Sequence, residues 1–354
     1  MGSMVKKRTH FFLFLAAFVL YLILFPAPLD REFSFLPQWS VFLDGAPAGM
    51  MEPSALGFRA ESGAGKILGY VSQDGRLLYK TGVYYDAVVH PAGFINYSRS
   101  GGTLTLQDPL GKIIDSLDTD GFPLVRGDDL FVVTRDRKGL SRWNWEGEEL
   151  WSYHFGALIT TMDVQSTGIL LGFLNGDVIL ISPQGVQQNF TRQRVHAVYG
   201  CALSDDQELF AVVSGLNPQT LGVYSFREGG VQLLWTRELS PAFPRYRYLQ
   251  FSEDSRSLYW VTPEGAETVN WMGEGARSFP LKAGFQTALW GESGALSMIL
   301  AGDGQVGELL FFQNSGNFHL SLPLRGGTSP VSLTGEALAA AQEGRLFSFR
   351  WEAR

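Results

Sequence analysis

Four histidines beyond the N-terminal segment carry the side chain that proteins use most often for metal binding and acid–base chemistry. They are His90, His154, His196 and His319. None belongs to a His-x-His or His-Glu-x-x-His motif, the close spacings that bring two imidazoles onto one ion. We therefore expect each histidine to be an ordinary surface or strand-end residue, and we predict no metal site.

Pairs of adjacent carboxylates could support glycoside hydrolysis, which needs one carboxylic acid and one carboxylate. Four pairs occur, namely Asp128-Asp129, Glu148-Glu149, Asp205-Asp206 and Glu253-Asp254. All four fall in segments that read as turns, where acidic residues are expected for local reasons. The chain has no Gly-x-Ser-x-Gly elbow, phosphate-binding loop or dinucleotide fingerprint. We expect a protein that is not an enzyme and has no cofactor.

The elements that must position these side chains repeat about every forty residues from Ala87 to the C-terminus. Each copy has four short apolar strands separated by polar or Gly-containing turns. At their second and third strands the copies cover residues 93–97 and 103–106, 130–133 and 140–143, 169–173 and 177–180, 209–213 and 221–224, 258–261 and 267–270, 296–300 and 308–311, and 337–340 and 346–349. Four strands per repeat of this length are typical of a β-propeller, an all-β ring of small sheets called blades.

The last copy ends before its fourth strand, so the ring needs a strand from elsewhere. The hairpin from Lys66 to Tyr79 precedes the first full copy and has no partner within its own repeat. Because an isolated hairpin is marginally stable and an open edge invites aggregation, we predict that it pairs with Arg345 to Trp351. This closure gives seven blades. Eight blades are the alternative, if residues 33–80 form a blade of their own.

Two kinds of repeat carry a resemblance to known families. Residues 201–209 and 249–258 resemble the first hairpin of WD40-like blades, with a Ser-x-Asp turn. Residues 138–151 resemble the outer hairpin of the quinoprotein-like (PQQ-type) propeller repeat, in which a final strand ends in a Trp that packs between blades. Residues 176–185 follow the same scheme without the Trp. The resemblance covers about residues 57–354 and implies a propeller, although no copy carries the Trp-Asp or Gly-His pairs of true WD40 repeats.

A set of basic and tyrosine residues is the feature that points to a partner. In a propeller, the loops between blades lie on the same face as the turns between second and third strands. The residues placed on that face are Arg135, Arg137, Lys138, Arg192, Arg194, Arg245, Tyr246, Arg247 and Tyr248. Arginine and tyrosine are enriched at the centres of protein interfaces. We predict that this face binds a protein.

The N-terminal segment reads as an export signal that stays attached. Fifteen apolar residues, Phe11 to Phe25, directly follow a basic stretch, and no small-residue cleavage site suits them. We expect residues 1–10 to be a cytoplasmic basic leader, 11–29 a signal-anchor transmembrane helix, 30–56 a tether and 57–354 the propeller. Because the basic residues precede the span, the N-terminus should be cytoplasmic and the propeller extracytoplasmic, in the periplasm if the host is bacterial.

Composition narrows the class of partner. The formal net charge is −7, which argues against nucleic acid. Cys201 is the only cysteine, so no internal disulfide can form, and it should be a buried small hydrophobe. We expect a membrane-tethered scaffold or envelope assembly factor that binds proteins, much as the quinoprotein-like lipoprotein of the outer-membrane assembly machine does. The alternative is an enzyme, or a carbohydrate or small-ligand binder, that uses the central channel.

Overall fold

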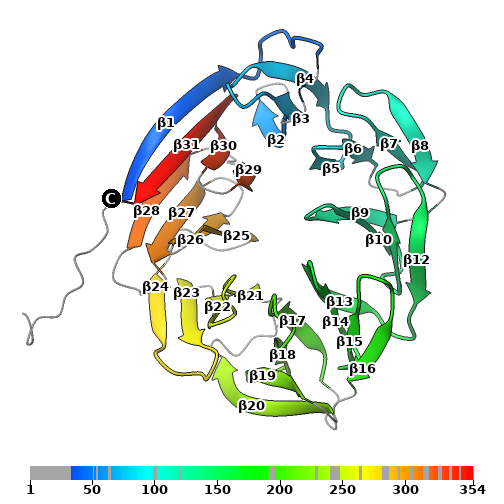
Figure 1. The fold of residues 1–354 in the computed structure, drawn as a ribbon, viewed down its shortest axis with the longest axis vertical. Coiled ribbons are helices and arrows are strands. Elements are labelled where there is room, and N and C mark those ends of the chain that lie inside the picture. Colours follow the sequence, from blue (N-terminus) through cyan, green and yellow to red (C-terminus); the bar gives the residue numbers. More distant parts are fainter. Residues whose placement is uncertain are drawn as a thin grey trace, which may run out of the picture. The chain divides into compact units, whose positions relative to one another are not determined.

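Every regular element in the described part of the chain is a β-strand (Figure 1). The structure is a computed structural model. It describes residues 33–50, 52, 55–62, 65–98, 102–117, 119, 121–190, 196–227, 230–239, 248–262, 265–280, 287–293, 296–302, 306–313, 319–325, 329–334, 337–342 and 344–353. The expected transmembrane segment, residues 11–29, lies outside these ranges. Within them, no helix is long and apolar enough to cross a membrane.

The strands form eight antiparallel sheets within the described ranges, and neighbours in the following order are paired. They are β2 (Leu56–Ser62), β3 (Gly65–Val71) and β4 (Leu77–Gly82); β5 (Asp86–His90), β6 (Gly93–Tyr97), β7 (Leu104–Gln107) and β8 (Ile113–Leu117); β9 (Gly121–Arg126), β10 (Asp129–Thr134), β11 (Gly139–Trp143) and β12 (Glu149–His154); β13 (Ile159–Gln165), β14 (Gly168–Phe173), β15 (Val178–Ile181) and β16 (Gln187–Phe190); β17 (Val198–Leu203), β18 (Leu209–Ser214), β19 (Gln219–Arg227) and β20 (Gly230–Leu239); β21 (Leu249–Phe251), β22 (Ser257–Thr262), β23 (Gly265–Asn270) and β24 (Arg277–Pro280); β25 (Thr287–Ser293), β26 (Leu296–Gly302), β27 (Val306–Gln313) and β28 (His319–Arg325); and β29 (Ser329–Thr334), β30 (Ala337–Gln342), β31 (Arg345–Ala353) and β1 (Phe33–Phe42).

The blade count differs from the expected seven. Seven sheets have four strands, as the repeat predicted, and the three-stranded sheet β2-β3-β4 adds an eighth. In Figure 1 the sheets follow one another around an opening, with the first strands innermost. The ring therefore has the alternative number of blades, although residues 33–80 do not all belong to one blade.

The closing strand is also different from the predicted one. An N-terminal strand does complete the C-terminal blade, but it is β1, which pairs with β31. The hairpin from Lys66 to Tyr79 lies in a separate blade, so its predicted pairing with Arg345 to Trp351 is wrong. The stretch assigned to a tether, residues 30–56, therefore contains a strand of the ring. Pro37 lies within β1, which is an edge strand among the described strands, and an edge strand tolerates proline because one of its sides needs no backbone N–H donor.

One turn recurs between the last two strands of five blades. Its first residue is Ser72, Asp108, Asn144, Ser182 or Asn270, and a glycine with positive φ stands three residues later. In each copy the first side chain accepts a hydrogen bond, of 2.7–3.1 Å, from the backbone N–H four residues on. These short polar side chains replace backbone partners, which fixes the turn, and glycine adopts the left-handed conformation at little cost.

The glycines of these turns are also the places where blades join at the outer rim. Gly147 lies against Asp115 of β8. On each of the other four, an aromatic side chain of the preceding blade's outermost strand packs: Trp39 on Gly75, Tyr79 on Gly111, Trp151 on Gly185 and Trp235 on Gly273. An added Cβ at these four glycines would lie within 3.0 Å of the ring in every case. The predicted packing of a Trp between blades is therefore observed at Trp151. We call these four pairs the rim contacts.

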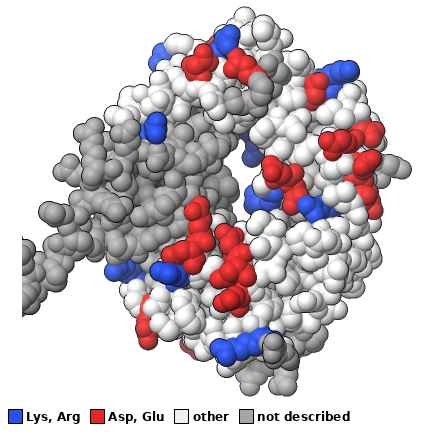
Figure 2. Space-filling view, viewed as in Figure 1, with Lys and Arg blue, Asp and Glu red and all other residues white. Residues whose placement is uncertain are grey.

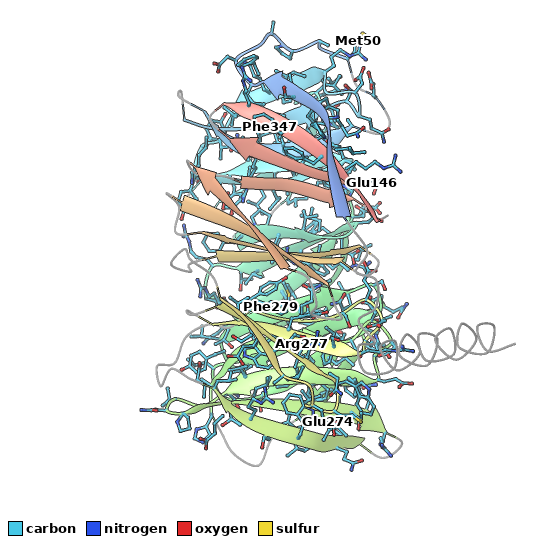
Figure 3. All side chains as sticks on the ribbon, turned by 90° about the vertical axis from the view of Figure 1, so that its left-hand side faces the viewer. Met50, Glu146, Glu274, Arg277, Phe279 and Phe347 are labelled. Carbon is cyan, nitrogen blue, oxygen red and sulfur yellow. The ribbon has the colours of Figure 1, made fainter. Side chains whose placement is uncertain are left out.

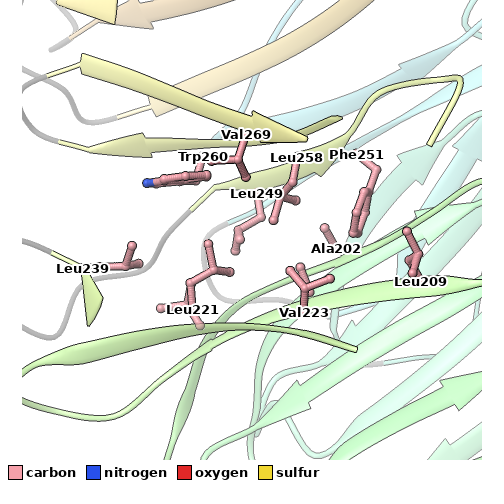
Figure 4. Close-up of a cluster of buried hydrophobic side chains, with 12 residues drawn as sticks. Ala202, Leu209, Leu221, Val223, Leu239, Leu249, Phe251, Leu258, Trp260 and Val269 are labelled. Atoms are coloured by element: carbon pink, nitrogen blue, oxygen red, sulfur yellow. The ribbon is translucent and has the colours of Figure 1, made fainter. Parts of the chain in front are cut away.

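Apolar clusters fill the spaces between blades. Figure 4 shows the cluster between the sheets β17–β20 and β21–β24, where Leu221, Leu249 and Trp260 are fully buried. Burying each such side chain contributes about 1.5–3 kcal/mol. Cys201 is buried on β17, as expected for a small hydrophobe. Since the strands are committed to this packing, the turns at the two faces of the ring are left to carry other roles.

Candidate partner-binding surface

The two faces of the ring carry different charges. The first face bears the turns between first and second strands and between third and fourth strands. All four acidic pairs lie there: Asp128-Asp129, Glu148-Glu149, Asp205-Asp206 and Glu253-Asp254. Figure 2 looks onto this acidic face and shows carboxylates gathered beside the central opening. Figure 3 shows the ring from the side, with Glu146 of the turn between β11 and β12 at its edge.

Three of the predicted partner-binding residues lie on the opposite face, which we call the basic face. Arg135, Arg137 and Lys138 form the turn between β10 and β11, and both arginines are exposed. Arg137 has a φ of 56°. The turn is held by Thr134, whose hydroxyl donates to Asp136 at 2.6 Å and accepts from the Gly139 N–H at 2.6 Å.

Asp136 is used by the turn itself. Its carboxylate accepts from Thr134 and from the Lys138 N–H, and the Thr134 hydrogen bond holds its pKa below the usual value. The carboxylate therefore stays ionised and fixes the turn. The three basic side chains outnumber it, so the turn remains positively charged at neutral pH.

Of the rest of the predicted set, the structure describes Tyr248 alone. Arg192, Arg194, Arg245, Tyr246 and Arg247 lie outside the described residues. Tyr248 is half-buried, and its hydroxyl donates to the side chain of Gln250 at 2.7 Å. Tyr248 therefore makes a hydrogen bond within its own blade, and its place in the partner-binding surface stays a prediction.

An aromatic cluster that the sequence analysis missed lies on the basic face, partly on the blade of the basic turn and partly on the blade before it. Ring contacts join Tyr85, Tyr97 and Phe122, and we include Tyr84 because it directly precedes Tyr85 in the same loop. Tyr84 is 82% exposed and Tyr85 is 46% exposed. The Tyr97 ring meets Tyr85 edge-on at 6.3 Å and Phe122 at 6.4 Å. Edge-to-face rings at this distance attract one another, so the cluster is a preformed apolar surface.

Hydrogen bonds hold the loop that carries the two exposed tyrosines. The Tyr84 N–H donates to the side-chain oxygen of Asn96 at 2.9 Å, and the Asn96 amide donates to the Gly82 carbonyl at 2.8 Å. A fixed loop loses little conformational entropy on binding, which favours its use as an anchor.

Asp86 connects the aromatic cluster to the neighbouring blade. One carboxylate oxygen forms an ion pair with Arg59 of β2, and the other accepts from the Tyr97 hydroxyl at 3.3 Å. Arg59 also donates to the Ala87 carbonyl at 2.7 Å. Burial, followed by the charge of Asp86, raises the pKa of Tyr97, so its hydroxyl remains a donor at any physiological pH.

The four histidines lie on four different blades: His90 ends β5, His154 ends β12, His196 precedes β17 and His319 begins β28. His90 stacks on Trp145, with ring centroids 4.5 Å apart, and its Nε2 lies 3.3 Å from an oxygen of Asp128. The Ala92 N–H donates to its Nδ1, so the proton of the neutral ring is on Nε2 and faces Asp128. Within the described residues no group of three or more His, Cys, Asp or Glu side chains could hold a metal ion.

One carboxylate at the inner edge of the ring bears on the alternative function. Asp163 of β13 accepts from the Leu203 N–H of β17 at 2.7 Å and from Gln165 at 3.3 Å. Burial raises the pKa of Asp163 to about 6. The carboxylate thus joins two blades, and it would change charge just below neutral pH.

Comparisons with known proteins agree with this architecture. A family model described as "beta-propeller protein" matches residues 3–318. An uncharacterized protein of Treponema pallidum (strain Nichols) is 21% identical over 276 residues, which cover 75% of this chain and 73% of that one.

Two solved structures share the fold at low sequence identity. BamB from Moraxella catarrhalis has a TM-score of 0.58 and 15% identity, with 90% of this chain and 98% of BamB covered. The computationally designed Ika8 protein has a TM-score of 0.60 and 13% identity, with 90% of this chain and all of the designed chain covered. At these identities the likeness concerns the fold alone.

Proposed function

Because the chain belongs to the β-propeller protein family, we propose that it is a non-enzymatic scaffold that binds proteins. Its basic face would take the partner, and its N-terminal segment would tether it to a membrane with the ring outside the cytoplasm. The observation that carries this proposal is the aromatic cluster, whose Phe122 lies on the same blade as an exposed basic turn. A fold like that of BamB is consistent with an envelope assembly role.

The aromatic cluster would supply most of the binding free energy. An exposed tyrosine buries a large apolar area on binding and has only two side-chain torsions to immobilise. Hot-spot residues of this type cost about 2 kcal/mol or more when truncated. Tyr84 is more exposed than Tyr85, which follows it in the same loop, so Tyr84 is the expected anchor.

The charges of the two faces would orient the partner. Arg135 and Arg137 attract a negatively charged surface, whereas the carboxylates of the opposite face repel it. Complementary charge raises the association rate and selects between faces, and it contributes less to affinity. An acidic partner would therefore approach the basic face.

Crosslinking in native membranes tests the proposal. We expect the partners captured by the wild-type chain to be lost from a variant that combines Tyr84→Ala with Arg135→Glu and Arg137→Glu. The matched control is Trp271→Ala with Arg76→Glu and Arg256→Glu, which changes three exposed residues on the acidic face. Equal capture by both variants would contradict the proposal, provided that both show the wild-type circular dichroism spectrum.

The membrane tether has its own test. Membrane fractionation with protease protection should recover the chain in the membrane pellet, with the ring accessible only from the extracytoplasmic side. A soluble mature protein would remove the tether from the proposal and leave the binding surface in place.

A second candidate function rests on Asp163, the carboxylate with the raised pKa at the inner edge. A ligand binder or enzyme would use such a group in the channel. Its hydrogen bonds to Leu203 and Gln165 give it a structural task, which favours the scaffold. Screening carbohydrates and small cations by calorimetry would support the second candidate if a ligand bound to the wild type and failed to bind Asp163→Asn.

A further inference from the structure

Within the described ranges, the three-stranded blade has counterparts of the second, third and fourth strands of the other blades, and no counterpart of the first. Its turn Ser72–Arg76, between β3 and β4, is the turn that joins the third and fourth strands in other blades. Tyr79 of β4 packs on Gly111 in the same way as Trp151 of the outermost strand β12 packs on Gly185. Both observations identify β3 and β4 as the third and fourth strands.

The innermost strand of this blade, β2, has the contacts of a second strand. Gly57 of β2 lies against Val89 of β5, and Arg59 reaches Ala87, so β2 and β5 run antiparallel. The second strand β14 meets the next blade in the same way. Gly172 lies against Val198, and the Leu170 carbonyl accepts from Cys201. First strands of neighbouring blades run parallel instead, since Thr161 contacts Cys201 while Asp163 contacts Leu203.

No strand of the described part of the chain therefore takes the place of a first strand on the inner side of β2. Within the described ranges β2 pairs with β3 alone, although β29 and β5 contact it from the two neighbouring blades. An unpaired strand edge presents a row of N–H and C=O groups that can pair with another chain. The second strands of the other seven blades have a first strand at this edge.

This place beside β2 is continuous with the candidate partner-binding surface. Arg59 of β2 binds Asp86, Asp86 accepts from Tyr97, and Tyr97 packs on Tyr85. An extended segment anchored on the aromatic cluster could thus pass along Asp86 to the edge of β2. The side chain of Arg59 is half-exposed, so it can also meet a carboxylate of that segment.

We infer that an extended segment of a partner protein adds to β2 as a first strand. The inference rests on the proposed function, because it names how the partner of the basic face would be held. The segment would be apolar at alternate positions, like the chain's own first strands, and acidic where it crosses Arg59 and the basic turn. Backbone pairing supplies affinity in this mode of recognition, and alternate side chains supply specificity.

A peptide that copies a first strand tests the inference directly. The probe is a fluorescein-labelled peptide with the sequence of residues 158–165, which include β13, added to the full-length protein in detergent. Two further peptides carry N-methyl groups on alternate amides, one along each edge of the strand. We expect saturable binding that one N-methylated peptide loses by at least tenfold and the other retains, because only one edge faces β2.

Amide hydrogen exchange locates the bound peptide. We expect protection of residues 56–62 to rise at least tenfold on binding, whereas β14, an already paired second strand, serves as the internal control. Absence of binding, equal binding by both N-methylated peptides, or unchanged exchange in β2 would overturn the inference. A protein that is dimeric alone and becomes monomeric with the peptide would assign the place to a second copy, and would overturn the partner assignment.

The same experiment separates this inference from the proposed function. The variant with Tyr84→Ala, Arg135→Glu and Arg137→Glu should still protect β2 when the peptide is added, since it leaves β2 unchanged. Peptide binding without any loss of native partners in that variant would keep the inference and reject the basic face. If that variant loses its native partners but the peptide does not bind, the basic face is kept as the binding surface and the added strand is rejected.

Discussion

The outer rim and the inner edge of the ring join blades by different means. At the rim the same contact recurs, in which an aromatic ring of one blade packs on a turn glycine of the next. At the inner edge the contacts are polar and differ from blade to blade, as Arg59 with Ala87 and Asp163 with Leu203 show. The contact that recurs at the rim stabilises the ring as a whole. A contact that differs from blade to blade, such as those at the inner edge, can serve binding as well.

The largest expected effect is at the rim. Replacing Trp151 with Ala removes its packing on Gly185 and Phe131 and its hydrogen bond to Pro183. The free energy of unfolding should fall by about 3 kcal/mol, as for other large aromatic truncations. Denaturant titration measures it. The neighbouring Leu150 is exposed, so Leu150→Ala should change stability by less than about 0.5 kcal/mol. Equal losses of unfolding free energy in the two variants would show that the rim contact of Trp151 does not stabilise the ring.

Alanine substitutions at two glycines distinguish the cost of backbone strain from the cost of disturbed packing at the rim. Gly185 and Gly275 both have positive φ, but only Gly185 has an aromatic ring where a Cβ would lie. Gly275→Ala should cost about 1 kcal/mol from the left-handed conformation alone. Gly185→Ala should cost about 2 kcal/mol, because Trp151 must also move. The difference between the two unfolding free energies isolates the contact, and no difference would argue against close packing there.

At the inner edge, Asp163 should make stability depend on pH. Its pKa of about 6 lies above the ordinary value, so the folded chain binds this proton more tightly than the unfolded chain. The stabilisation is fully present below about pH 4 and is lost as the pH rises through 6.

Asp163→Asn keeps an acceptor for the Leu203 N–H and removes the titration. We expect the variant to be about 1–2 kcal/mol more stable than wild type at pH 7, after allowance for solvent screening, and to lack the slope between pH 4 and 6. Thermal melts across that range measure both. A slope that persists in the variant would assign it to another group.

The smallest expected effect on stability is at the basic face. Tyr84 is mostly exposed, so Tyr84→Ala should leave the midpoint of denaturation unchanged within about 0.5 kcal/mol. Partner capture should nevertheless fall at least tenfold. A variant that loses stability and capture together would make Tyr84 a packing residue, and the basic face would lose its anchor.

The regular parts of this fold could be predicted because they repeat. Apolar strands and turn glycines recur at a fixed period, so the strands and the placement of Arg135 and Arg137 on one face followed from spacing alone. The turn Ser72-Gln73-Asp74-Gly75 already matched Ser182-Pro183-Gln184-Gly185 in sequence, and it marked Lys66 to Tyr79 as part of a blade. The sequence repeat did not reveal this segment as a separate blade, because the blade has three strands and the repeat predicts four.

The irregular parts could not be predicted, since they join segments that share no pattern. Tyr97 and Phe122 come from different blades, and neither stands out among twenty-six phenylalanines and twelve tyrosines. Only Tyr84-Tyr85 was visible as an exposed pair after a strand. The strand β1 follows a long apolar run and contains Pro37, so it read as a tether and not as part of a sheet.

Because β1 pairs with β31, the ring can close only after the C-terminal strand has been synthesised. About 300 residues separate the two strands, and at roughly 5–20 residues per second a ribosome needs about 15–60 s to make them. During that interval β1 has emerged without its partner, and its open edge could pair with other chains. A nascent chain of this kind depends on whatever shields its first strand until the last one arrives.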